Sequence, residues 1–134
     1  MSTTSKVIIV SVMVAFVFML ITGVTFIPST HFNFDADEVS RITIFDGSNG
    51  EEVEVTDDAV IKHITDNINR VEYRRGWLDF NMGYTYTIKL YDTDDELISK
   101  LTVRGDSRIT YNRFSYVAKE HSIDYEYIGS LFNE

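Results

Sequence analysis

Cysteine is absent from this chain of 134 residues, and proline occurs once. Without cysteine the chain has no disulfide bond, no thiol nucleophile and no cysteine that could carry a lipid. The three histidines, His31, His63 and His121, are widely separated, and no H-E-x-x-H motif accompanies them. The sequence therefore predicts no metal site.

Basic residues are also few, with 12 Lys and Arg against 21 Asp and Glu. All the acidic residues follow residue 27, and Lys6 is the only basic residue before it, so the part after residue 27 carries a charge of 11 − 21 = −10. Nucleic acid and anionic lipid headgroups repel a domain with this charge. We therefore expect no nucleic-acid binding and a domain that stands off the membrane surface.

The motifs that mark catalytic and cofactor sites are missing as well. No serine lies in a G-x-S-x-G or S-x-x-K pattern, and no glycine-rich loop for a nucleotide is present. The acidic loops 46–51 and 92–97 begin like calcium-binding loops, but Glu51 and Leu97 stand where such a loop needs glycine. Residues 104–107 spell the adhesion tetrapeptide Arg-Gly-Asp-Ser, which we interpret as a turn between strands. We expect no catalytic residue and no cofactor, and weak adventitious calcium binding stays open.

One long apolar segment dominates what is present: residues 7–27 contain no charged side chain. As a helix these residues extend about 31 Å, which matches the hydrocarbon thickness of a bilayer. The sequence predicts a transmembrane helix. A cleaved secretory signal is an open alternative, although its apolar region is usually only about 7–15 residues long. A buried helix of a soluble core is the other alternative, and about 100 further residues are too few to cover it.

The distribution of basic residues predicts the orientation of this span. Lys6 precedes it, whereas the first basic residue on the other side is Arg41, so the positive-inside rule places the N-terminus in the cytoplasm. Ser11 and Ala15 have the small-xxx-small spacing that lets two helices approach closely, which leaves dimerisation open.

Four segments follow from this interpretation: a short cytoplasmic tail (1–6), a transmembrane helix (7–27), a juxtamembrane linker (28–38) and an extracytoplasmic domain (39–134). Pro28 ends the helix. We expect His31 and Phe32 in the interfacial layer of the membrane. The protein is thus expected in the cell membrane, with a single span.

The domain alternates short strand patterns with two helical patterns. Period-two alternation and turn residues predict strands at 39–45, 51–55, 84–91, 96–104, 108–111 and 114–117. A helix capped by Thr56 or Asp57 is predicted to run to Arg70, and a short one capped by Ser122 closes the chain. The first helix has an apolar stripe made of Val60, Ile61, Ile64, Ile68 and Val71. This order predicts an α+β domain, a small antiparallel sheet with two helices on one face.

Three segments carry a resemblance to a known group of proteins. They are the helix motif with Asn67, Asn69 and Tyr73, the strand YTIKLYD at 86–92, and the ITYN…Y close at 109–116. With the order of elements, they resemble small uncharacterised membrane-anchored or lipoprotein domains of Gram-positive bacteria over residues 39–132. The resemblance implies a fold and a location and no site residue. This chain differs from the lipoprotein members because it lacks the lipidated cysteine.

The most informative segment for function is 73–83, which we expect to be irregular. Arg74, Arg75, Trp77 and Phe80 gather there, and Tyr84 follows at its exit. Trp, Tyr and Arg are enriched at the centres of interfaces, so these five residues are the predicted partner-binding site. The alternative is that Trp77 and Phe80 fold back to close one end of the core.

These observations together predict a membrane-anchored protein whose extracytoplasmic domain is a non-catalytic binding or accessory module. Its partner is an unidentified protein or a component of the cell envelope. Two alternatives stay open: a cell-envelope hydrolase or hydrolase inhibitor that uses acidic residues in a groove, and a small subunit of a membrane complex.

Overall fold

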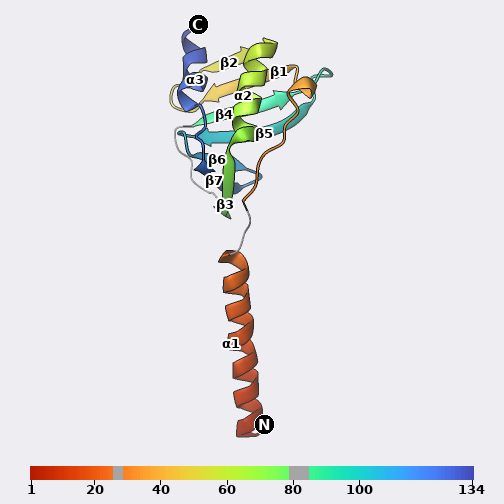
Figure 1. Ribbon diagram of the computed structural model, residues 1–134, viewed down its shortest axis with the longest axis vertical. Coiled ribbons are helices and arrows are strands. Elements are labelled where there is room, and N and C mark those ends of the chain that lie inside the picture. Colours follow the sequence, from red (N-terminus) through yellow and green to blue (C-terminus); the bar gives the residue numbers. More distant parts are fainter. Residues whose placement is uncertain (26–28, 79–84) are drawn as a thin grey trace.

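The computed structural model describes residues 1–25, 29–78 and 85–134 (Figure 1). The first helix, α1 (Thr3–Thr25), contains a 21-residue stretch, Thr3–Gly23, that is long and apolar enough to cross a membrane. None of its most apolar window is buried inside the molecule, so α1 is not a core helix of this domain. By length and composition α1 is suited to cross a membrane, and a signal sequence near the N-terminus meets the same criteria.

The described part of the domain is a single seven-stranded antiparallel sheet with helices, as an α+β fold requires. The strands are β1 (Arg41–Asp46), β2 (Glu52–Val55), β3 (Glu72–Leu78), β4 (Tyr86–Tyr91), β5 (Leu97–Arg104), β6 (Arg108–Tyr111) and β7 (Phe114–Glu120), in the spatial order β2-β1-β4-β5-β6-β7-β3. The helices are α2 (Asp58–Arg70) and α3 (Tyr125–Ser130), with 3-10 turns η1 (Ala36–Glu38) and η2 (Leu131–Asn133).

Helix α2 forms where the sequence predicts it. Asp57 is its N-cap and accepts hydrogen bonds from the backbone N–H groups of Ala59 and Val60 at 2.9 and 3.1 Å. Because α2 connects β2 at one edge of the sheet with β3 at the other, it crosses one face of the sheet (Figure 1). The opposite face has no described helix on it.

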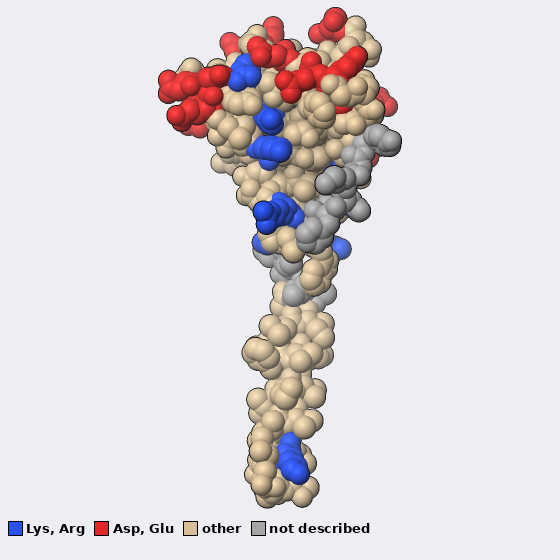
Figure 2. Space-filling view, turned by 180° about the vertical axis from the view of Figure 1, so that it is seen from behind, with Lys and Arg blue, Asp and Glu red and all other residues tan. Residues whose placement is uncertain are grey.

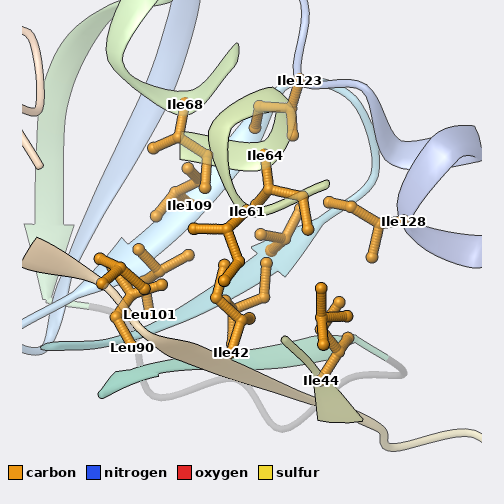
Figure 3. Close-up of a cluster of buried hydrophobic side chains, with 14 of the residues drawn as sticks. Ile42, Ile44, Ile61, Ile64, Ile68, Leu90, Leu101, Ile109, Ile123 and Ile128 are labelled. Carbon is orange, nitrogen blue, oxygen red and sulfur yellow. The ribbon is translucent and has the colours of Figure 1, made fainter. Parts of the chain in front are cut away.

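The core lies between α2 and the sheet and consists largely of isoleucine (Figure 3). Ile61 and Ile64 of α2 point toward Ile42 and Ile44 of β1, and Ile128 of α3 joins them from the side (Figure 3). All five of these side chains are buried. Both helices therefore bury their apolar faces against the same side of the sheet.

Two local predictions are wrong. Residues 73–78 are not irregular, because β3 runs to Leu78 and pairs with β7, with Arg74 opposite Val117. The sequence of β3 does not alternate, and its pairing partner lies more than 35 residues away, so only the assembled sheet makes it a strand. The last helix has Asp124, not Ser122, at its N-cap.

The segment before β1 packs on the domain. The ring of Phe32 lies 5.1–5.3 Å from the rings of Tyr73, Tyr111 and Tyr116, in place of the membrane interface expected from the sequence. The Asn69 side chain bonds both backbone groups of Phe34, accepting from its N–H at 2.9 Å and donating to its C=O at 2.7 Å. The connection between α1 and the folded domain is therefore shorter than the predicted linker.

Asn67 makes an equivalent pair of hydrogen bonds to the segment that leads into α3. Its side chain donates to the backbone C=O of Ser122 at 3.2 Å and accepts from the backbone N–H of Asp124 at 2.8 Å. The two asparagines of the α2 motif thus hold the segments that lead into β1 and into α3. The side chains of Asn67 and Asn69 therefore have a structural role, because their hydrogen bonds go to backbone groups and not to a ligand.

The turn between β6 and β7 carries backbone strain that a substitution can remove. Asn112 and Arg113 have φ values of +49° and +70°, the left-handed pair of a two-residue hairpin turn, in which glycine is favoured at the second position. Arg113→Gly is expected to raise the free energy of unfolding by about 0.5–1 kcal/mol, because glycine adopts this φ without a steric penalty. Urea unfolding checks this. Arg113→Ala keeps the strain and serves as the control, and an equal gain in both variants would contradict it.

Candidate functional site: the open face of the sheet

The face of the sheet opposite α2, which we call the open face, carries basic and hydroxyl side chains. Strand residues alternate between faces, so buried Ile88 and Leu90 leave Thr87 and Lys89 on the open face. Figure 2 shows this side of the domain, with Lys and Arg side chains along its middle and Asp and Glu gathered at the end far from α1. On this face, therefore, basic and acidic side chains occupy separate regions.

Two pairs of like charges stand directly opposite each other on this face. Lys89 of β4 is the register partner of Lys100 of β5, and Arg104 of β5 is the partner of Arg108 of β6. Directly opposed residues on antiparallel strands have Cβ atoms about 5 Å apart, and like charges at that distance destabilise a sheet. These pairs work against folding unless a counter-charge lies between them.

Between the two pairs runs a row of hydroxyl groups. Thr87, Thr102, Thr110 and Ser115 are successive register partners across β4, β5, β6 and β7. Hydroxyl groups donate hydrogen bonds to anionic oxygens. Lys100 and Arg104 are four residues apart on β5, which places the two cationic pairs about 13 Å apart on either side of this row.

The carboxylates that would neutralise Lys89 and Lys100 are elsewhere in the described part of the chain. Arg41, at the side of the face near β2, bonds Asp95 at 3.0 Å through Nε and lies 3.5 Å from Glu54. Among the residues that the structure describes, no carboxylate lies within 4 Å of the Lys89 or Lys100 ammonium group. Two close cations with no carboxylate beside them can hold an anion.

The opposed lysines make a test of this repulsion possible. Lys100→Thr is expected to raise the free energy of unfolding by about 0.2–1 kcal/mol, because it removes the like charge opposite Lys89. Urea unfolding in low and high salt checks this, since salt screening should shrink the gain. Lys62→Thr is the control, because Lys62 is paired with Asp66 at 2.8 Å. A loss of stability in Lys100→Thr would contradict the repulsion.

The structure describes three of the five residues predicted from the sequence as a partner site. Arg74 and Arg75 are exposed on β3, and the Arg75 guanidinium lies 3.8 Å from the centre of the Phe114 ring. Trp77 is 79% exposed, so it does not fold back to close the core. Phe80 and Tyr84 lie outside the described residues. The three described residues share the outer strand β3, at the edge of the sheet.

Sequence reasoning missed the open face, although a signal for it was present. Lys and Thr alternate with apolar residues in 86–91 and again in 97–104, and residues of one strand that are two apart share a face. The pattern predicts a polar face, but not which residues stand opposite one another. That depends on the register, including an irregularity between Leu90 and Tyr91.

The described histidines and acids form no metal centre. His63 Nε2 lies 2.9 Å from Asp124 Oδ2, and its ring is 3.9 Å from the Tyr127 ring, so this histidine links α2 to the start of α3. No three His, Asp or Glu side chains gather as metal ligands in the described ranges. The Arg-Gly-Asp-Ser stretch contains the turn between β5 and β6, where Gly105 has a φ of +62°.

Comparisons of the chain with protein-family models, with curated proteins and with solved structures find no match, so the fold and the open face have to be interpreted from their own chemistry.

Proposed function

We propose that this is a single-pass membrane protein whose extracytoplasmic domain is a non-catalytic module that binds an extended anionic polymer of the cell envelope on the open face. The observation that supports this most directly is the pair of opposed lysines, Lys89 and Lys100, with no carboxylate of the described residues beside them. Their repulsion costs stability, and an anion bound between them would remove that cost.

The form of the ligand follows from the spacing on the face. One phosphate or carboxylate group cannot reach both cationic pairs, because they are about 13 Å apart along β5. A polymer with repeated anionic groups can contact both pairs and receive hydrogen bonds from the hydroxyl row between them. Binding to such a polymer should weaken as salt rises.

The location rests on α1 and on Lys6. The helix is apolar over a membrane-spanning length, and the basic residue at its start favours a cytoplasmic N-terminus. The large acidic domain then lies outside the cytoplasm, where it meets envelope polymers.

Two measurements test this proposal. Purified full-length protein in nanodiscs of zwitterionic lipid is titrated with long-chain polyphosphate and with inorganic phosphate, at low and at moderate salt. We expect saturable binding of the long chain that weakens with salt, and far weaker binding of phosphate. No binding of the long chain would overturn the ligand class. Protease treatment of intact cells tests the sidedness: digestion of the domain supports it, and protection contradicts it.

A further inference from the structure

The edge of the domain at β3 is held close to the end of α1. Thr30 and Tyr73 form an isolated antiparallel bridge, with two backbone hydrogen bonds of 2.8 Å between their N–H and C=O groups. Thr30 comes three residues after Ile27, the last residue of the apolar run. Three residues span at most about 10 Å, and the headgroup layer beyond the hydrocarbon is about 5–8 Å thick. In a chain whose α1 spans a membrane, this short connection holds Tyr73 at the membrane surface.

Side-chain contacts reinforce this attachment. The Lys119 ammonium group donates to the Ser29 hydroxyl at 2.9 Å and lies 3.7 Å from the Glu72 carboxylate. A hydrogen bond from Ser29, and then the charges of Lys119 and His31, hold the pKa of Glu72 below its ordinary value. Ser29 is thus part of the folded domain, only two residues after the apolar run.

The direction of β3 decides which of its residues face the membrane. In an antiparallel bridge, the residues after Tyr73 lie on the same side as the residues before Thr30, which is the side of α1. Figure 1 shows β3 running toward α1, so its last residues are at the end of the domain nearest that helix. These are Trp77 and Leu78.

The residues at this end have the chemistry of a membrane interface. Trp77 is 79% exposed and Leu78 is 47% exposed, although both are apolar. Arg74 and Arg75 precede them, and Arg113 lies in the turn next to Phe114, the register partner of Leu78. Tryptophan concentrates at the headgroup level of membranes, and arginine forms bidentate hydrogen bonds with phosphate. Asp79, which follows Leu78 in the chain, lies outside the described residues.

We infer that residues 74–78, together with Arg113, form a membrane-contact edge that lies in the headgroup layer of the bilayer in which α1 is anchored. Trp77 and Leu78 enter the interface, and the arginines bind lipid phosphates. On the face that Figure 2 shows, the acidic residues gather at the end far from α1. Glu72 lies near Ser29, but its carboxylate is 3.7 Å from the Lys119 ammonium group, so it does not prevent this contact. The inference rests on the membrane anchor of the proposed function, and it replaces the expectation that the domain stands off the membrane.

Trp77 is the only tryptophan of the chain, so its fluorescence reports on this edge alone. Full-length protein is reconstituted in nanodiscs of phosphatidylglycerol and phosphatidylcholine, with and without lipids brominated near the headgroup. We expect the brominated lipids to quench Trp77 and aqueous acrylamide to quench it weakly. Strong quenching by acrylamide together with none by brominated lipid would overturn the inference.

Substitution of the arginines tests the phosphate contact. In the anchored protein, the edge of the domain either contacts the headgroup layer or is detached from it. Arg74→Gln/Arg75→Gln/Arg113→Gln should shift this equilibrium toward the detached state by about fivefold per arginine, on the order of 100-fold in all. Quenching by brominated lipid should fall accordingly. The matched control is Lys62→Gln/Lys89→Gln/Lys100→Gln, which removes the same number of charges away from β3 and should leave the quenching unchanged. Equal quenching in both variants would show that the arginines make no such contact.

Flotation on a density gradient, with the protein reconstituted in vesicles of the same lipids, distinguishes a failure of the anchor from a failure of the membrane-contact edge. Protein that does not float with the lipid contradicts the anchor and thus the proposed function. Protein that floats while Trp77 stays fully accessible to acrylamide contradicts the membrane-contact edge and leaves the anchor intact.

Discussion

Replacing Tyr73 with alanine is expected to lower the free energy of unfolding of the domain by about 3–5 kcal/mol, the range for removing a buried aromatic ring. Tyr73 is completely buried, and its burial raises its pKa above the ordinary value. Its ring packs edge-on against Phe32 at 5.1 Å, and its hydroxyl donates to the backbone C=O of Ile68 at 3.2 Å. The ring therefore joins β3, α2 and the segment that leads to α1. Urea unfolding of the full-length protein in nanodiscs, followed by circular dichroism, measures the loss.

Tyr73→Phe is the matched control for this prediction. It keeps the ring and removes only the hydrogen bond to Ile68, so it should cost about 0.5–1.5 kcal/mol. Equal losses in the two variants would mean that the hydroxyl, and not the ring, carries the stability. A loss below about 1 kcal/mol in Tyr73→Ala would contradict the packing.

Reversing the charge of both open-face lysines, in Lys89→Glu/Lys100→Glu, is expected to weaken binding of long-chain polyphosphate by about 100-fold or more. A hydrogen bond to a charged group contributes about 1.5–3 kcal/mol, and two such contacts are lost. Repulsion between the new carboxylates and the polymer adds to the loss. The dependence of log affinity on log salt should also become shallower by about two, since two cationic contacts disappear. Titration at several salt concentrations gives both quantities.

The control for this variant changes the net charge equally on the other side of the sheet. Lys62 and Arg70 are both exposed on α2, so Lys62→Glu/Arg70→Glu makes the domain as acidic without altering the open face. It should bind nearly as well as the original chain. Equal losses in the two variants would mean that overall charge, rather than the opposed lysines, governs binding. That result would contradict the open face as the polymer-binding site.

The candidate sites show where sequence reasoning succeeded and where it could not. Arg74, Arg75 and Trp77 could be selected because their residue types are conspicuous in an acidic domain. Their location on an edge strand near the membrane could not, because it depends on pairing with β7 and with Thr30. Neither Lys89 nor Lys100 is distinctive in the sequence, because single lysines are common on strands. Only the register shows that the two face each other.

The features that can be predicted from the amino-acid sequence alone are those that depend on near neighbours in the chain. The apolar run predicts the helix α1, Asp57 and the stripe with Ile61, Ile64 and Ile68 predict α2, and alternation predicts most strands, because helix and strand periods are local. Only the folded chain produces the strand β3, the opposed lysines Lys89 and Lys100 of the open face and the attachment at Thr30. Each of these joins segments more than ten residues apart, and which partners meet is set by the packing of the whole core and not by either segment.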